Sequence, residues 1–195
     1  SKTVGNDIAV VRANLEKADW IRAAVPGTVF GSLVEAGVYK DPFWGTRMDS
    51  IPAAPFQTPW WFKTTFNLQN FSKENEAVAL FIDGINYRAD IWLNNQQIAT
   101  KDSIYGAFKQ FKLAINQAAK EGENTLLVKV YPPEVRDFYM GFVDWAPTPP
   151  DHFMGIFRDI RLKRSGKVMI NDAFFKTDFN PADTSQAALT VDIGV

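Results

Sequence analysis

Residues 80–94 read LFIDGINYRADIWLN, from Leu80 to Asn94, and they set the structural class expected for the chain. Apolar side chains fall at Leu80 and Ile82 before the turn residues Asp83-Gly84, and again at every second position from Ala89 to Leu93. Alternation with a period of two is typical of a strand with one buried face, and Asp-Gly is favourable turn chemistry. We therefore expect two β-strands in this stretch.

The same period of two recurs on both sides of this stretch. The apolar positions concerned are Trp60, Phe62, Phe66 and Leu68; Val78; Leu126, Val128 and Val130; and Ile156, Ile160 and Leu162. We expect the last group to form one strand whose face also contains Arg158, buried and paired. Many short strands separated by polar turns indicate an antiparallel sandwich rather than alternating strands and helices.

Helical signal is slight. Thr28 is a good N-cap for a short helix through Phe30, Leu33 and Val34, which would end at Gly37. Two long irregular segments, 38–59 and 131–154, contain too many aromatic residues for disorder, and we expect both to be ordered surface loops.

The alternation restarts after Arg164-Ser165-Gly166. Ala173, Phe175, Thr177 and Phe179 alternate with other residues, as do Ala187, Leu189, Val191, Ile193 and Val195, which predicts a hairpin. We interpret residues 1–165 as one domain and residues 166–195 as the first strands of a second β domain that is truncated.

Composition excludes several functional classes. The chain has 195 residues, 46% of them hydrophobic, and a formal net charge of -1, which gives no basis for binding nucleic acid. No apolar run is long enough to span a membrane, and no signal peptide is recognisable. Cysteine is absent and His152 is the one histidine, so we expect no metal site and no cofactor.

Four motifs, in order, resemble the N-terminal domain of glycoside hydrolase family 2. They are Val25-Pro26-Gly27-Thr28-Val29, Asp41-Pro42-Phe43-Trp44-Gly45-Thr46, residues 80–94, and Met154-Gly155-Ile156-Phe157-Arg158-Asp159-Ile160, the last preceded by Asp144-Trp145-Ala146-Pro147 and Pro149-Pro150-Asp151. The resemblance implies an all-β chain: a galactose-binding-domain-like jelly roll, then the start of an immunoglobulin-like sandwich.

The resemblance also implies a function. Members of this family are retaining exo-β-glycosidases, in which one carboxylic acid acts as acid/base and a second carboxylate as nucleophile. Both belong to a (β/α)₈ barrel that this chain lacks, so we assign no catalytic residue here and expect the chain alone to be inactive. Its expected partners are a carbohydrate substrate and the absent immunoglobulin-like and barrel domains.

The subfamily implied is narrower. Gly84-Ile85-Asn86-Tyr87-Arg88-Ala89-Asp90 and the Pro149-Pro150-Asp151 run look most like exo-β-glucosaminidases and related β-mannosidase-like enzymes. The β-galactosidases share parts of both motifs, and β-galactosidase remains the alternative specificity.

Five residues are candidates for substrate binding by this resemblance. Asn86 matches an asparagine that reaches the catalytic pocket, and its amide can both donate to and accept from sugar hydroxyls. Asp144 and Asp151 lie where the family places an acid near the sugar site, and a carboxylate there could pair with a substrate ammonium. Each of the three could instead stabilise a turn.

Trp44 and Trp145 could form stacking walls for a sugar ring, whose axial C–H groups are apolar, or could anchor the long loops to the domain. Two other functions remain open: a free-standing carbohydrate-binding module, and a structural or protein-interaction sandwich. The family resemblance further suggests a periplasmic or secreted location.

Overall fold

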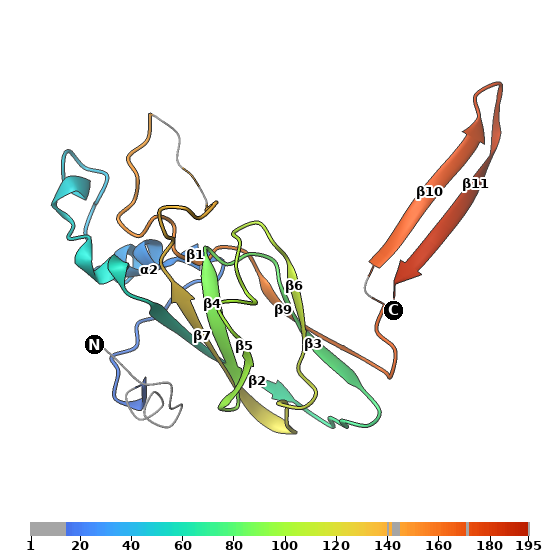
Figure 1. Ribbon diagram of the computed structural model, residues 1–195, viewed down its shortest axis with the longest axis horizontal. Coiled ribbons are helices and arrows are strands. Elements are labelled where there is room, and N and C mark those ends of the chain that lie inside the picture. The colour runs from blue at the N-terminus through green and yellow to red at the C-terminus, as the bar shows by residue number, and fades with distance from the viewer. Residues whose placement is uncertain (1–14, 140, 142–144, 171, 195) are drawn as a thin grey trace.

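The computed structural model describes residues 15–139, 141, 145–170 and 172–194. Within them, two antiparallel sheets pack face to face (Figure 1). The four-stranded sheet has the order β2 (Trp60–Leu68), β7 (Gly122–Tyr131), β4 (Arg88–Leu93) and β5 (Gln96–Ala99). The three-stranded sheet has the order β6 (Phe111–Ala114), β3 (Ala77–Ile82) and β9 (Ile160–Ser165). The predicted all-β sandwich is confirmed.

The core lies between the sheets and includes many of the alternating residues predicted from sequence, together with loop residues such as Ile85, Ile104 and Met154. Ile82 from β3 and Ile91 from β4 are completely buried, and so is Val130 from β7. Opposite faces of these strands carry polar residues such as Asp90 and Lys129, which lie directly across from each other between β4 and β7. The period of two therefore matches one buried and one outer face on each strand.

A short helix covers one end of the sandwich. Helix α2 (Val29–Glu35) begins where the Thr28 hydroxyl accepts a hydrogen bond of 3.0 Å from Gly31 N, and Gly37 follows it with φ of 77°. This confirms the predicted cap and end. The helix buries Phe30 and Leu33, and the Phe30 ring packs edge-on against Phe56, which lies in η2 (Ala54–Gln57). A second single turn of 3-10 helix, η1, spans Met48–Ser50.

The strand predicted through Ile156 and Leu162 is two strands, so that prediction is wrong. β8 (Gly155–Ile156) pairs with β1 (Gly27–Thr28), whereas β9 pairs with β3. Arg158 lies between β8 and β9, where it is exposed, and its guanidinium stands 5.7 Å from the Phe157 ring centre. The chain stops pairing with β1 and begins to pair with β3 at this point. The spacing of the apolar residues gives no sign of this change.

The end of β9 is tied firmly to the turn that precedes β3. The Arg164 guanidinium donates to both carboxylate oxygens of Glu76, at 2.9 and 2.6 Å. It also donates to the carbonyl oxygens of Gln69 at 2.7 Å and Asn70 at 2.8 Å. Four hydrogen bonds therefore fix the strand just before residues 166–170 leave the sandwich.

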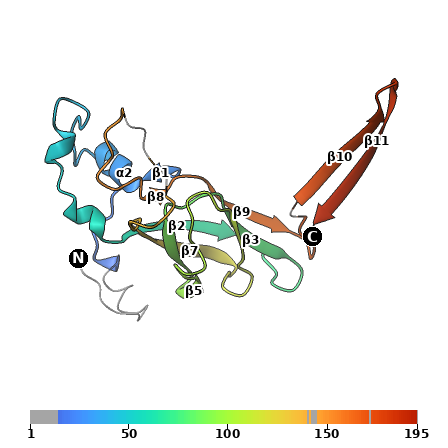
Figure 2. The same cartoon turned by 45° about the horizontal axis from the view of Figure 1, so that its top comes forward.

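The last two strands, β10 (Asp172–Asn180) and β11 (Asp183–Gly194), form a hairpin that extends away from the sandwich (Figure 2). Among the described strands, they pair only with each other. Its register places apolar residues on one face, and these stay exposed: Phe175, Phe179, Leu189, Val191 and Ile193. The predicted hairpin is present. Its assignment to a second domain that begins near residue 166 stays a prediction.

Core packing predicts a large difference between two similar substitutions. Ile91→Ala should lower the free energy of unfolding by about 2–5 kcal/mol, because it leaves a cavity between the sheets. Leu162→Ala should cost about 1 kcal/mol or less, since Leu162 is 37% exposed on an edge strand and leaves no enclosed cavity. Urea unfolding measures both values, and equal losses would contradict this account of the core.

Candidate functional site

Asn86 lies in the connection between β3 and β4 and is completely buried. Its Nδ2 donates a hydrogen bond of 2.9 Å to the carbonyl oxygen of His152. Its backbone exchanges two further bonds with Gly155, at 2.9 and 3.0 Å. The amide therefore holds a turn 66 residues away in sequence. That it also contacts a sugar stays a prediction.

Asp151 is also buried, and both of its carboxylate oxygens accept hydrogen bonds from backbone groups. Oδ2 accepts from Phe30 N at 2.7 Å, in the first turn of α2, and Oδ1 accepts from Phe153 N at 2.9 Å. Burial raises the pKa of the Asp151 carboxyl above its ordinary value, and these hydrogen bonds oppose the rise. The carboxylate thus joins α2 to the end of the 131–154 loop, and a sugar contact for it stays a prediction.

The two candidate tryptophans are the most accessible of the predicted residues. Trp44 is 74% exposed and Trp145 is 87% exposed, each in one of the two long loops. The described parts of both loops project from the end of the sandwich opposite the hairpin, as the cyan and orange segments of Figures 1 and 2 show. The fifth candidate, Asp144, lies outside the described residues.

More exposed aromatic rings gather on these loops. Phe43 neighbours Trp44, and together with Asp41 and Arg47 the two rings line a shallow hollow of about 460 Å³. Phe138, also exposed, contacts Phe108 with ring centres 6.3 Å apart. Exposed aromatic rings on these loops make this end of the domain the candidate contact surface of the described residues.

Arg88, at the first position of β4, is a residue of this end that sequence reasoning did not single out. Its guanidinium forms ion pairs with Glu134 at 2.8 Å and with Asp137 at 2.5 Å, both near the start of the 131–154 loop. The one available signal was a charged residue at the start of a predicted strand, two positions after the candidate Asn86.

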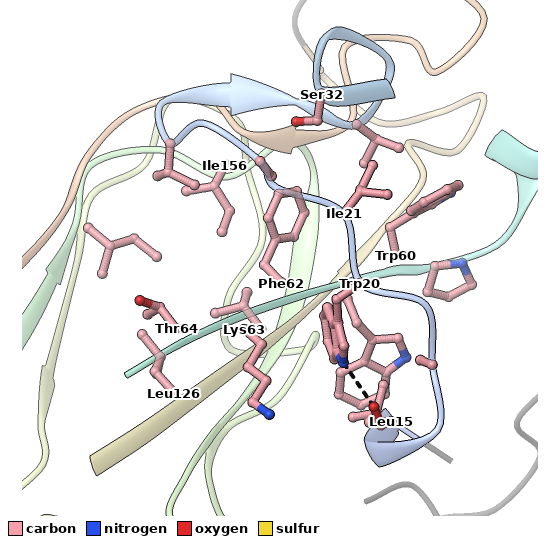
Figure 3. A pocket seen from close by; sticks show the side chains of 18 of the residues that line it. Leu15, Trp20, Ile21, Ser32, Trp60, Phe62, Lys63, Thr64, Leu126 and Ile156 are labelled. Atoms are coloured by element: carbon pink, nitrogen blue, oxygen red, sulfur yellow. Dashed lines mark hydrogen bonds between the residues drawn. The ribbon is translucent and has the colours of Figure 1, made fainter. Parts of the chain in front are cut away.

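A larger hollow lies elsewhere, along the edge of the sandwich between β2 and β9 (Figure 3). It is a groove of about 790 Å³ whose walls include the inward-facing side chains Trp60, Phe62 and Leu126. Trp20 closes one side, where its Nε1 donates to the Leu15 carbonyl oxygen at 2.9 Å. The residues that line the groove include none of the five candidates, and most of its walls are apolar side chains at the open edge of the core.

Two further findings concern the described part of the chain. Among those residues, no group of three or more histidine, cysteine, aspartate or glutamate side chains could hold a metal ion. No helix there is long and apolar enough to cross a membrane.

Comparison with known proteins identifies close relatives. Residues 10–140 match the family described as glycosyl hydrolase 2 galactose-binding domain-like. The exo-β-D-glucosaminidase of Amycolatopsis orientalis is 38% identical over 192 residues, which cover 98% of this chain and 18% of that protein. The mannosylglycoprotein endo-β-mannosidase of Lilium longiflorum is 30% identical, over 83% of this chain and 19% of its own length.

Solved structures agree. The crystal structure of the Amycolatopsis orientalis exo-chitosanase superposes with a TM-score of 0.81 at 38% identity, and the match covers 89% of this chain and 20% of that one. The chain thus spans about a fifth of the length of the relatives it matches.

The raised pKa of Asp151 predicts a pH-dependent stability. The folded state binds the Asp151 proton more tightly than the unfolded chain does, so the protonated carboxyl adds to the free energy of unfolding. This added stability is complete below the ordinary aspartate pKa of 3.8 and is lost as the pH rises through the raised pKa of the folded state. Asp151→Asn should remove this loss, whereas Asp49→Asn, which removes an exposed carboxylate, should keep it. Urea unfolding between about pH 3 and pH 8 tests this. Parallel stability curves for the unsubstituted chain and D151N would contradict it.

Proposed function

Because this chain belongs to glycoside hydrolase family 2, we propose that it is the non-catalytic N-terminal region of a β-glycosidase that hydrolyses O-glycosidic bonds in carbohydrate. The match to about a fifth of the length of such enzymes supports this assignment. In this proposal the two catalytic carboxylates belong to a barrel domain elsewhere in the protein.

The exposed aromatic end of the sandwich is the observation on which the proposal depends. Trp44 and Trp145 present large, uncovered rings on two loops at one end, where a neighbouring domain could close a pocket over them. A tryptophan face suits the apolar C–H face of a sugar ring. We assign the sugar contacts of this chain to these two rings, because the Asn86 and Asp151 side chains are buried and already bonded within the protein.

A β-linked glucosaminide is the substrate class we favour. Relatives named exo-β-D-glucosaminidase reach 38% identity with this chain, whereas the mannosidase from lily reaches 30%. Such a sugar carries an ammonium group, which would favour a carboxylate near its pocket. We also propose that the enzyme acts in the periplasm or outside the cell, where polymers of such sugars are met.

The proposal predicts that the 195-residue chain does not hydrolyse aryl β-D-glucosaminides, while the longer protein that contains it does. Acid/base and nucleophile are both required for a retaining mechanism, and this chain contributes neither. Release of the chromogenic aryl group measures both activities. Turnover by the purified chain would contradict the proposal.

In the longer protein, Trp145→Ala should raise KM for the aryl glucosaminide about tenfold and leave kcat within about twofold, as expected when a stacking contact is lost. Trp92→Ala is the matched control, because Trp92 packs at a tilt against Trp61 on the outer face of the four-stranded sheet, with ring centres 5.1 Å apart. A W145A enzyme with an unchanged KM would remove Trp145 from the sugar site.

A further inference from the structure

We propose that Asn86 and Arg88, at the entry to β4, hold both ends of the 131–154 loop and so act as positioning residues for Trp145. The role of Trp145 in binding sugar rests on the function proposed above, but the two-ended attachment does not. We call Asn86, Arg88 and their partners on the loop the clamp.

Arg88 attaches the first part of the loop. One nitrogen, Nη1, contacts Glu134 at 2.8 Å and the other, Nη2, contacts Asp137 at 2.5 Å. Asp137 in turn closes a local turn, because its Oδ2 accepts from Glu134 N at 2.8 Å and its own N donates to the Glu134 carbonyl at 2.9 Å. The Asp137 side chain is only 8% exposed, so this pair is better shielded from water than ordinary surface ion pairs.

Asn86 attaches the last part of the loop. Its amide donates to the His152 carbonyl, and its backbone pairs with Gly155. His152 and Phe153 both adopt positive φ, at 49° and 60°, which non-glycine residues rarely do without support from their surroundings. The hydrogen bonds from Asn86 and those accepted by Asp151 supply that support.

The two attachments are also connected to each other. The Tyr139 ring, on the first part of the loop, meets the His152 ring edge-on with centres 5.9 Å apart. Trp145 lies between the two attached ends in the sequence, and its ring is almost fully exposed. With so little packing of its own, Trp145 depends on the clamp for its position.

Limited digestion with trypsin tests the clamp in the 195-residue chain itself. Arg136 is exposed and lies inside the turn held by Arg88, so its peptide bond becomes a substrate when the turn opens. Arg88→Gln should speed cleavage after Arg136 by about tenfold, because proteolysis follows the population of the open form.

Arg164→Gln is the matched control, since Arg164 also pairs with a partly shielded carboxylate, that of Glu76, but on β9. It should leave cleavage after Arg136 within about twofold of the unsubstituted chain. Equal rates of cleavage after Arg136 in R88Q and R164Q would overturn the clamp. Comparing the urea midpoints of the two variants separates local opening from general loss of stability.

The longer protein then separates the clamp from the proposed function. If both hold, R88Q raises KM for the aryl glucosaminide about tenfold with little change in kcat, and R164Q does not. Fast cleavage after Arg136 together with an unchanged KM would support the clamp and overturn the role of this loop in sugar binding. If R88Q is cleaved after Arg136 no faster than the unsubstituted chain, the clamp is overturned, whatever the KM of the R88Q enzyme.

Discussion

The reciprocal backbone hydrogen bonds between Asn86 and Gly155 are the constraint on which most of this structure depends. They join the connection between β3 and β4 to the point where the chain re-enters the sandwich after its longest loop. Gly155 allows a very close approach here, because a Cβ atom at this position would stand 2.5 Å from the Gly27 carbonyl oxygen. Through Gly155 the pairing extends to β1, and from there to α2.

Buried polar groups complete this junction where apolar packing alone would leave backbone groups without partners. The Asp151 carboxylate accepts from the first turn of α2 and from the turn beside it, and Asn86 satisfies the carbonyl between them. A helix of only seven residues is too short to be stable alone, so its attachment at this point matters. The junction therefore orders the helix, the loop end and the strand entry as one unit.

Sequence reasoning was sufficient where the controlling interactions are local. Alternation identified β3, β4 and β7, and the Thr28 hydroxyl could be recognised as a cap because its partner is three residues away. It failed where partners are distant. The exposed Arg158 looked buried because its place between two strands depends on pairing with β1 and β3, which no local pattern encodes.

The candidate site shows the same division. Family motifs pointed to Asn86 and Asp151, and the structure places both in one junction, yet their partners lie 66 and 121 residues away and could not be read from spacing. The exposure of Trp44 and Trp145 was equally hidden, because a tryptophan in a long loop can anchor it as readily as project from it. Arg88 was not identified because its structural role depends on ion pairs with two acids, Glu134 and Asp137, that lie far from it in the sequence.

The four hydrogen bonds of Arg164 have a mechanical consequence. A force applied along residues 166–170 first reaches the end of β9. There the Arg164 guanidinium donates hydrogen bonds to Glu76 and to the carbonyl oxygens of Gln69 and Asn70. Force is thereby shared with β3 and its preceding turn instead of peeling β9 away one pair at a time.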